Sequence, residues 1–321
     1  MLARLSDARG GAPAHAGSRG RPLRLPAVAA AVLALVILLP SAAAASTGVD
    51  DWVHAWEVVR LVDYRQSQPW PPDGIMVYYL GDSIARESTV SDADWSRQLA
   101  LRAATAGKAT AFGFTVAGHN QTFGMDERIV EGLPVTPDRQ PRGIVLIGVG
   151  ISRFIGPPAP LDPAALDPVA PDAEPPLSAW VQHRYEGRAP LSPARKRELA
   201  ARWMERRWDG FQANRRANFA AINRLIAACK AKRLRPILFD LPLNFAVVGH
   251  RLDEPLSVIR GRCTDIARRN GIKYLRFNRS LGLRSAVFWD LHHLLGPGTT
   301  RWQSRLSDEL VKLLPDAQPV Q

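Results

Sequence analysis

The chain has 321 residues, of which 46% are hydrophobic and 22% are charged. This balance is typical of a globular protein and excludes a disordered, collagen-like or disulfide-scaffold chain. The formal net charge is +12, and much of the positive charge lies between residues 195 and 235, where Arg and Lys mix with Glu and Trp at helical spacing. That spacing is typical of a solvated helix face. No nucleic-acid-binding module accompanies it, so no nucleic-acid partner is expected.

The N-terminal 45 residues have the pattern of a targeting segment. An Arg-rich and Gly-rich stretch leads into an apolar run that begins at Pro26, and small residues follow up to Ser46. Ala43 and Ala45 fit a cleavage site, but an apolar run of about 20 residues is also long enough to remain as a membrane anchor. We therefore expect a signal peptide or signal anchor over 1–45. The preceding basic flank places the rest outside the cytoplasm, either anchored or secreted.

From residue 46 onward, short apolar runs alternate with amphipathic patterns, which predicts a single α/β domain with a parallel sheet over 46–321. A helix over 51–64 is expected to precede the first strand. Five strands are expected at 75–80, 109–116, 144–149, 236–241 and 272–277, and five helices between and after them at 92–106, 121–133, 194–232, 254–270 and 298–314. A Pro-rich insertion at about 153–193 interrupts this alternation.

The cysteines are only two, Cys229 and Cys263. Two cysteines exclude a disulfide framework and a zinc site. One disulfide between two helices and two buried free thiols both remain open from the sequence.

Ser83 is the first candidate for chemistry, since Gly81-Asp82-Ser83 follows the first expected strand directly. A serine on a strand-to-helix turn lies at the carboxyl edge of the sheet, where α/β proteins bind their ligands. Its own N–H belongs to the positive end of a helix and can donate to an oxyanion. The alternative interpretation is an ordinary helix cap made by Asp82 or Ser83.

A possible base and its partner lie near the other end of the chain, in Asp290-Leu291-His292-His293. A serine nucleophile needs a base to accept its proton, and the base needs a carboxylate to orient it. Asp290 and His293 are three residues apart, so one turn can place both at the same rim. His292 is the rival base, and an ordinary surface turn is the alternative for the whole segment.

Together, Gly81-Asp82-Ser83 and Asp290-Leu291-His292-His293, at opposite ends of a five-strand pattern, resemble the first and last blocks of the SGNH (GDSL-type) hydrolase superfamily. The resemblance implies a flavodoxin-like three-layer sandwich with a five-strand parallel sheet. It implies Ser83 as nucleophile, His293 as general base and Asp290 as its partner, with no metal and no cofactor.

The oxyanion hole implied by this resemblance is only partly present. Gly118, after the second strand, matches the glycine of the second block, although relief of crowding at the strand end explains it as well. The third block normally reads Gly-x-Asn, but the chain has Gly150 in place of the asparagine. Removing one such donor costs about 2.7 to 4 kcal/mol. Asn120, Ser152 and Arg153 are the candidate replacements.

Further contacts to a substrate are expected from four residues. Arg86 resembles the arginine of a Gly-Asp-Ser-x-x-Arg variant in membrane-tethered relatives and would pair with an anionic substrate, unless it pairs with Asp82 or Glu87 instead. Asn244 follows the fourth strand at the same rim. Trp180 and Tyr185, in the insertion, would stack on sugar rings.

We therefore expect an exported serine esterase that acts on an acyl ester, such as an O-acetyl group, of an envelope glycan or lipid. An acyltransferase with the same triad and a catalytically inactive envelope-binding protein are the alternatives. The absence of the third-block asparagine favours the inactive protein, whereas the combination of Ser83, Asp290 and His293 disfavours it. A nucleotide-binding domain is not expected, because the chain has neither of the glycine-rich phosphate-binding motifs.

Overall fold

The computed structural model describes residues 74–118, 120–133, 143–159, 185 and 187–317. The predicted targeting segment, the helix expected over 51–64 and most of the insertion, including Trp180, lie outside these ranges. Within them, no helix combines the length and the apolar character that a membrane span requires.

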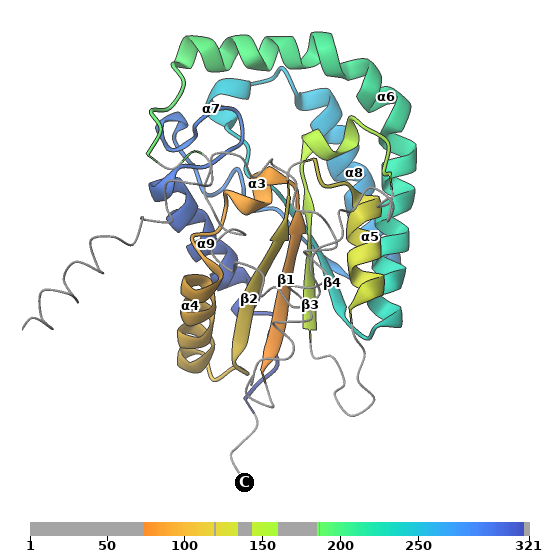
Figure 1. Ribbon diagram of the computed structural model, residues 1–321, viewed down its shortest axis with the longest axis vertical. Coiled ribbons are helices and arrows are strands. Elements are labelled where there is room, and N and C mark those ends of the chain that lie inside the picture. The colour runs from red at the N-terminus through yellow and green to blue at the C-terminus, as the bar shows by residue number, and fades with distance from the viewer. Residues whose placement is uncertain (1–73, 119, 134–142, 160–184, 186, 318–321) are drawn as a thin grey trace, which may run out of the picture. The chain divides into compact units, whose positions relative to one another are not determined.

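A five-stranded parallel sheet forms the centre of the described part of the chain (Figure 1). Its strands are β1 (Ile75–Gly81), β2 (Ala111–Ala117), β3 (Gly143–Val149), β4 (Arg235–Asp240) and β5 (Lys273–Leu275). The strand order is β2-β1-β3-β4-β5, which is the flavodoxin-like order. The predicted fold class is therefore confirmed, and each expected strand is present within a few residues of its predicted bounds.

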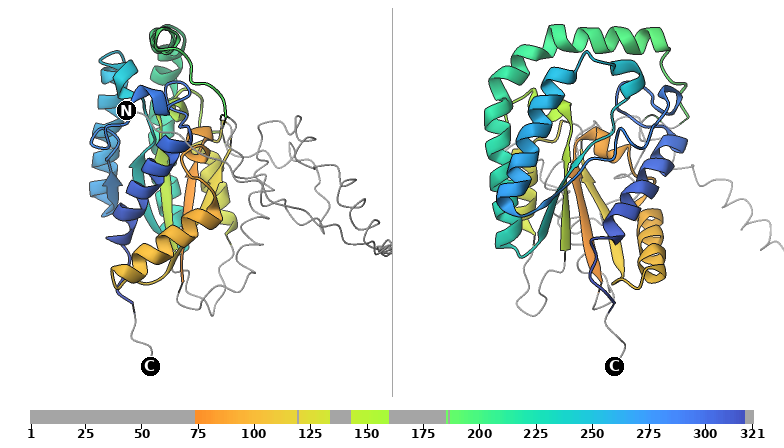
Figure 2. Two further views of the ribbon diagram at one scale, coloured as in Figure 1. Left: turned by 90° about the vertical axis from the view of Figure 1, so that its left-hand side faces the viewer. Right: turned by 180° about the vertical axis from the view of Figure 1, so that it is seen from behind.

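Helices cover both faces of this sheet (Figures 1 and 2), as the uninterrupted apolar runs of the central strands require. On one face lie α5 (Phe123–Gly132), α6 (Pro193–Ala231) and α8 (Asp253–Asn270). On the other lie α4 (Asp92–Thr105) and α9 (Gly296–Val311). Each face has its own buried hydrophobic cluster, so the described part has three layers.

Local sequence signals explain where these helices begin and end. Ser91 caps α4 by accepting a hydrogen bond from the Asp94 N–H. Ser192 does the same for α6, where Pro193 occupies the first turn, a position that needs no N–H donor. Gly271 ends α8 in the left-handed conformation, with φ of 64°, which is favourable for glycine.

The long helix α6 first crosses the end of the sheet at which α3 (Ser83–Arg86) and α7 (Phe245–Val248) lie and then runs down one side of the sheet (Figure 1). Its charged residues are largely exposed, as the sequence predicts, and pair with one another, for example Arg195 with Glu198 at 2.6 Å.

The two cysteines are free and buried. Burial raises the pKa of the Cys229 thiol to about 12 and raises the pKa of Cys263 as well. Both thiols therefore stay protonated, and of the two alternatives left open by the sequence the structure has the pair of buried thiols.

Candidate active site

Ser83 is the first residue of the short helix α3, directly after the tight turn that leaves β1. The turn depends on Gly81, because a Cβ atom at that position would lie 2.5 Å from the Cβ of Ala85. Asp82 caps α3 by accepting a hydrogen bond from the Ile84 N–H at 3.0 Å. The cap interpretation is thus correct for Asp82. It leaves the Ser83 hydroxyl available for another partner.

That partner is His293, which is 210 residues away in the chain. The Oγ atom of Ser83 lies 3.0 Å from Nε2 of His293. The Nδ1 atom of His293 lies 2.9 Å from Oδ2 of Asp290. All three side chains are buried, with 7 to 9% of each residue exposed. The structure therefore brings together the hydroxyl, imidazole and carboxylate in the relative order of a serine-hydrolase triad.

The backbone also fixes the Asp290 carboxylate. Its Oδ1 atom accepts hydrogen bonds from the N–H groups of His292 and His293, both at 2.9 Å. Burial alone would raise the pKa of Asp290, but the attraction of His292 and the hydrogen bond from His293 outweigh it, so this pKa lies well below its usual range. Asp290 is therefore a carboxylate at neutral pH, which is the form that orients an imidazole N–H and stabilises an imidazolium.

His292, the rival base, takes another position. Its Nε2 atom lies 3.9 Å from Oδ2 of Asp290, and its ring packs edge-on against that of His293. Burial lowers the pKa of His292, although the Asp290 carboxylate acts in the opposite direction. His293, and not His292, is therefore the imidazole placed to accept the Ser83 proton.

Asp290, His292 and His293 also bring three potential metal-ligand atoms within 4.8 Å of one another. However, Oδ2 of Asp290 and Nδ1 of His293 are already hydrogen-bonded to each other. A metal ion that used these atoms would replace the contact that orients the imidazole. Holding a metal and forming the triad are thus mutually exclusive uses of the same side chains.

The structure corrects the substrate contact predicted for Asn244. This side chain is fully buried, so it cannot line an open cleft. Its Nδ2 donates to the carbonyl of Asp290 at 3.2 Å and to Oγ of Ser285 at 3.0 Å, while its backbone N–H donates to the carbonyl of Leu291 at 2.8 Å. Asn244 therefore supports the loop that carries Asp290.

The structure also corrects the substrate contact predicted for Arg86. The side chain is 9% exposed and pairs with the buried carboxylate of its neighbour Glu87 at 3.2 Å. This agrees with the alternative interpretation, in which Arg86 pairs within the protein. A guanidinium committed to a buried ion pair is not available to an anionic substrate, because binding the substrate would break that pair.

The oxyanion side of the site lies at the carboxyl ends of β1, β2 and β3. Gly81 pairs with Ala117 in the sheet register, so Gly118 follows β2 beside the turn that carries Ser83. The N–H of Ser83 lies in the first turn of α3, where backbone donors have no partner within the helix. Asn120 is exposed and has a φ of 56°, so the chain turns sharply there.

Two of the three replacements considered for the third-block asparagine are committed elsewhere. Ser152 donates its hydroxyl proton to Oδ2 of Asp82 at 2.7 Å. Arg153 points into the core, where its Nη2 contacts Oδ2 of Asp126 at 2.6 Å and its Nη1 donates to the carbonyl of Gly148 at 2.6 Å. Arg153 as an oxyanion donor was thus a wrong prediction, because its guanidinium is fully buried in this network. Asn120 remains a prediction.

Gly150 has no side chain that could donate to the oxyanion at the position of the third-block asparagine. A Cβ atom at this position would lie 3.0 Å from Cδ1 of Leu241 and 3.4 Å from Oγ of Ser152. These contacts are tight but involve the ends of side chains, so a larger residue is admissible if Leu241 shifts or is shortened.

We accordingly expect Gly150→Asn, combined with Leu241→Ala to make room, to raise kcat for ester hydrolysis by about tenfold or more, because it restores an amide donor to the oxyanion. Leu241→Ala alone is the control, and kcat on a small acetyl ester is the measurement. An unchanged kcat in a folded double variant would show that another group already supplies this donor.

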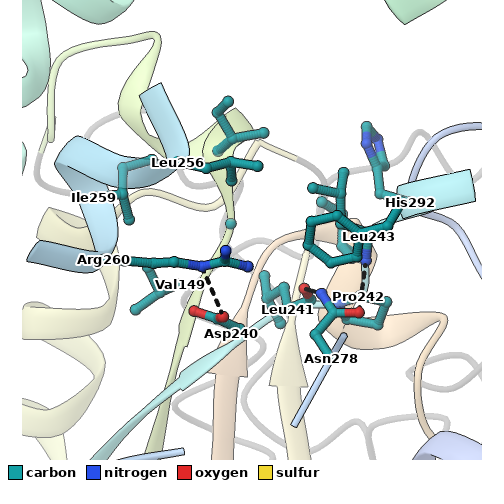
Figure 3. Close-up of a pocket in the computed structure, with 14 residues that line it drawn as sticks. Val149, Asp240, Leu241, Pro242, Leu243, Leu256, Ile259, Arg260, Asn278 and His292 are labelled. Atoms are coloured by element: carbon teal, nitrogen blue, oxygen red, sulfur yellow. Dashed lines mark hydrogen bonds and ion pairs between the residues drawn. The ribbon is translucent and has the colours of Figure 1, made fainter. Parts of the chain in front are cut away.

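A small pocket lies next to the triad loop, at the carboxyl ends of β3 and β4 (Figure 3). Apolar side chains dominate its lining, an ion pair between Arg260 and Asp240 at 3.4 Å lies on one side of it, and His292 also lines it. The volume open to the centre of a water-sized sphere is about 20 Å³, which is room for about one small group.

Sequence reasoning missed two residues that contact the triad loop from α6 and the insertion. The ring of Tyr185 lies 4.6 Å from that of His293 and stacks on Trp289 at 4.3 Å; the sequence suggested Tyr185 only as a sugar contact. Lys196 donates to the carbonyls of Ser285 and Phe288. Its position in a charge-rich helix gave no signal of burial.

Comparison with models of known protein families and with curated proteins finds no match. Among solved structures, the chain is similar to a lipase/acylhydrolase from Enterococcus faecalis, with 11% identity and a TM-score of 0.41 over 76% of this chain and 98% of that one. A GDSL-like lipase from Bacteroides thetaiotaomicron has 12% identity and a TM-score of 0.40, over 81% of this chain and 100% of that one. A family two carbohydrate esterase from Clostridium thermocellum has 12% identity and a TM-score of 0.39, over 76% of this chain and 65% of that one. At these identities and TM-scores the matches carry no argument about the activity of this chain. The activity is therefore inferred from the sheet order and from the contacts in the candidate site.

Proposed function

We propose that this protein is a serine esterase that removes a small acyl group from an ester by covalent catalysis. The observation that carries the proposal is the chain of contacts from Ser83 Oγ to His293 Nε2 at 3.0 Å and from His293 Nδ1 to Asp290 Oδ2 at 2.9 Å. An activated serine lies within hydrogen-bond distance of its base, and a third group orients that base. The three side chains here have this arrangement.

In the proposed reaction, the Ser83 hydroxyl attacks the ester carbonyl while Nε2 of His293 takes its proton. The negative charge that develops on the carbonyl oxygen is accepted by the N–H groups of Ser83 and Gly118. The imidazolium then gives its proton to the departing alkoxide, which leaves the acyl group on Ser83. Water attacks this acyl-enzyme with His293 again as base, so an acid is released and the serine is regenerated.

The size of the acyl group is the next part of the proposal. The pocket lined by His292 in Figure 3 has room for about one small group. Its apolar lining favours a methyl group over a charged one. We infer an acetyl ester on the premise that the acyl group enters this pocket, whose lining includes Ile84 next to Ser83 but neither Ser83 nor His293.

The proposed substrate carrier is an envelope glycan or lipid outside the cytoplasm. This part rests on the targeting pattern of residues 1–45, which indicates export with or without a retained anchor. An acyltransferase would use the same triad with a sugar hydroxyl in place of the water that attacks the acyl-enzyme. A non-catalytic binding protein is the second candidate, favoured by Gly150 in place of an oxyanion donor.

A fluorophosphonate probe separates an esterase from a binding protein, because only an activated serine forms the covalent phosphonyl adduct. We expect stoichiometric labelling of the purified chain, with the adduct mapped by mass spectrometry to the peptide that contains Ser83. His293→Ala should slow the labelling strongly. A wild-type protein that stays unlabelled at high probe concentration would support the binding protein instead.

A further inference from the structure

The loop that carries Asp290 and His293 is held by a buried lysine from α6. Lys196 is only 2% exposed. Its Nζ atom donates to the carbonyl of Ser285 at 2.7 Å and to the carbonyl of Phe288 at 2.7 Å, and it lies 3.5 Å from Oγ of Ser285. An ammonium group has three donors and no acceptor. The hydrogen-bond contacts of Nζ go to Ser285 and Phe288, in the segment just before Asp290.

Such a lysine is costly to bury. Taking an ammonium out of water carries a desolvation penalty, and a neutral side chain would fill the same space without it. Burial accordingly lowers the pKa of Lys196, and the Asp290 carboxylate opposes that shift. The Asp290 carboxylate thus favours the charged form of Lys196, and the two carbonyls that Nζ contacts give a reason for a cation at this position beyond packing.

Other contacts hold the same segment from two sides. From the sheet side, Asn244 donates to Oγ of Ser285 and to the carbonyl of Asp290. From the α6 side, the Leu191 N–H donates to the carbonyl of Trp289 at 2.9 Å. These contacts hold the segment from residue 285 to 290 in place, and the Lys196 ammonium is the one charged donor among them.

We propose that Lys196 is a positioning residue of the triad, which holds the loop of Asp290 and His293 in the geometry that activates Ser83. The inference rests on the proposed esterase function. It also connects the start of α6, directly after the insertion, to the reactivity of a serine more than one hundred residues earlier in the chain. Lys196 itself contacts no reacting atom.

The test compares Lys196→Met and Lys196→Gln with Lys232→Met. Lys232 is a matched control, because this C-cap residue of α6 also donates to a backbone carbonyl, that of Leu133 at 2.7 Å, but on another loop. We expect both Lys196 variants to lower kcat and the rate of fluorophosphonate labelling by at least tenfold, with KM changed less than threefold. Lys232→Met should leave both rates within twofold of the wild type. Measurements are made at a temperature where each variant is folded.

A spectroscopic readout keeps the inference testable even without turnover. The proton between His293 Nδ1 and Asp290 gives a low-field proton resonance when that hydrogen bond is well formed, and we expect it to shift or broaden in Lys196→Gln but not in Lys232→Met. If Lys196→Met does not fold at any temperature tested, the rates and the resonance of Lys196→Gln test the inference. Wild-type rates and an unchanged resonance in a folded Lys196 variant would overturn the inference alone. A wild-type protein without labelling or turnover would instead overturn the proposed function.

Discussion

Ser83→Ala and His293→Ala are each expected to lower kcat for hydrolysis of a small acetyl ester by at least about 10⁴-fold. The hydroxyl of Ser83 is the atom that would form the covalent bond, and His293 is its hydrogen-bonded partner at 3.0 Å. Because nucleophile and base act as a unit, the double variant should be no slower than either single variant. Asp290→Asn should cost a similar factor, because an amide favours the wrong tautomer of the imidazole.

The chain offers a matched control for these variants. His250 and Asp253 are also three residues apart, with Nδ1 of His250 2.7 Å from Oδ2 of Asp253, but the histidine side chain is 99% exposed. His250→Ala should therefore keep the wild-type kcat. Circular dichroism and thermal melting of each variant show whether the fold is retained. If folded Ser83→Ala and His293→Ala keep the wild-type rate, the esterase assignment is wrong.

Arg153→Met is expected to lower the free energy of unfolding by about 3 to 5 kcal/mol, because it leaves a buried carboxylate without its counter-charge. Arg153 and Asp126 form a fully buried ion pair with Nη2 and Oδ2 2.6 Å apart. The network continues through Gln121, whose Nε2 donates to Oδ1 of Asp126 at 2.6 Å. Urea unfolding followed by circular dichroism measures the change.

The loss in Arg153→Met should depend on pH in a defined direction. Burial raises the pKa of Asp126, while Arg153 opposes that shift. Without Arg153 the folded state holds the Asp126 proton more tightly than the unfolded state. Protonation of Asp126 then stabilises the variant fully at a pH below the usual aspartate pKa, and this contribution is lost as the pH rises through the raised value. The loss in free energy of unfolding, relative to the wild type, should therefore be largest at neutral pH.

Two further variants make this prediction specific. Arg153→Met/Asp126→Leu removes both charges and should recover much of the lost stability. Arg224 and Glu127 form an exposed counterpart at 3.0 Å, with the arginine side chain 54% exposed, and Arg224→Met should cost less than about 1 kcal/mol. An Arg153→Met protein as stable as Arg224→Met at neutral pH would contradict the role assigned to the buried pair.

The candidate nucleophile was predictable because its signals are local. A buried apolar run, Gly81 and the cap residue Asp82 together specify a strand, a tight turn and a helix start, and these depend on neighbours within a few residues. Asp290 and His293 were predictable for the same reason, since three residues of separation place both side chains on one turn. Asn244 was misjudged because its partners, Ser285 and Asp290, lie in a distant part of the chain, whereas for Arg86 the neighbouring Glu87 had already offered the alternative that the structure has.

The amino-acid sequence by itself determined the alternation of strands and helices, the turn that carries Ser83 and the Asp–His pair, because periodicity and turn chemistry act over short stretches of chain. Only the tertiary structure decided that His293 rather than His292 faces Ser83, that Arg153 belongs to the core and that Lys196 holds the triad loop. Those outcomes join residues 27 to 210 positions apart. The physical reason is that a buried charge or hydroxyl is satisfied by whichever partner the packing of the whole chain brings within hydrogen-bond distance.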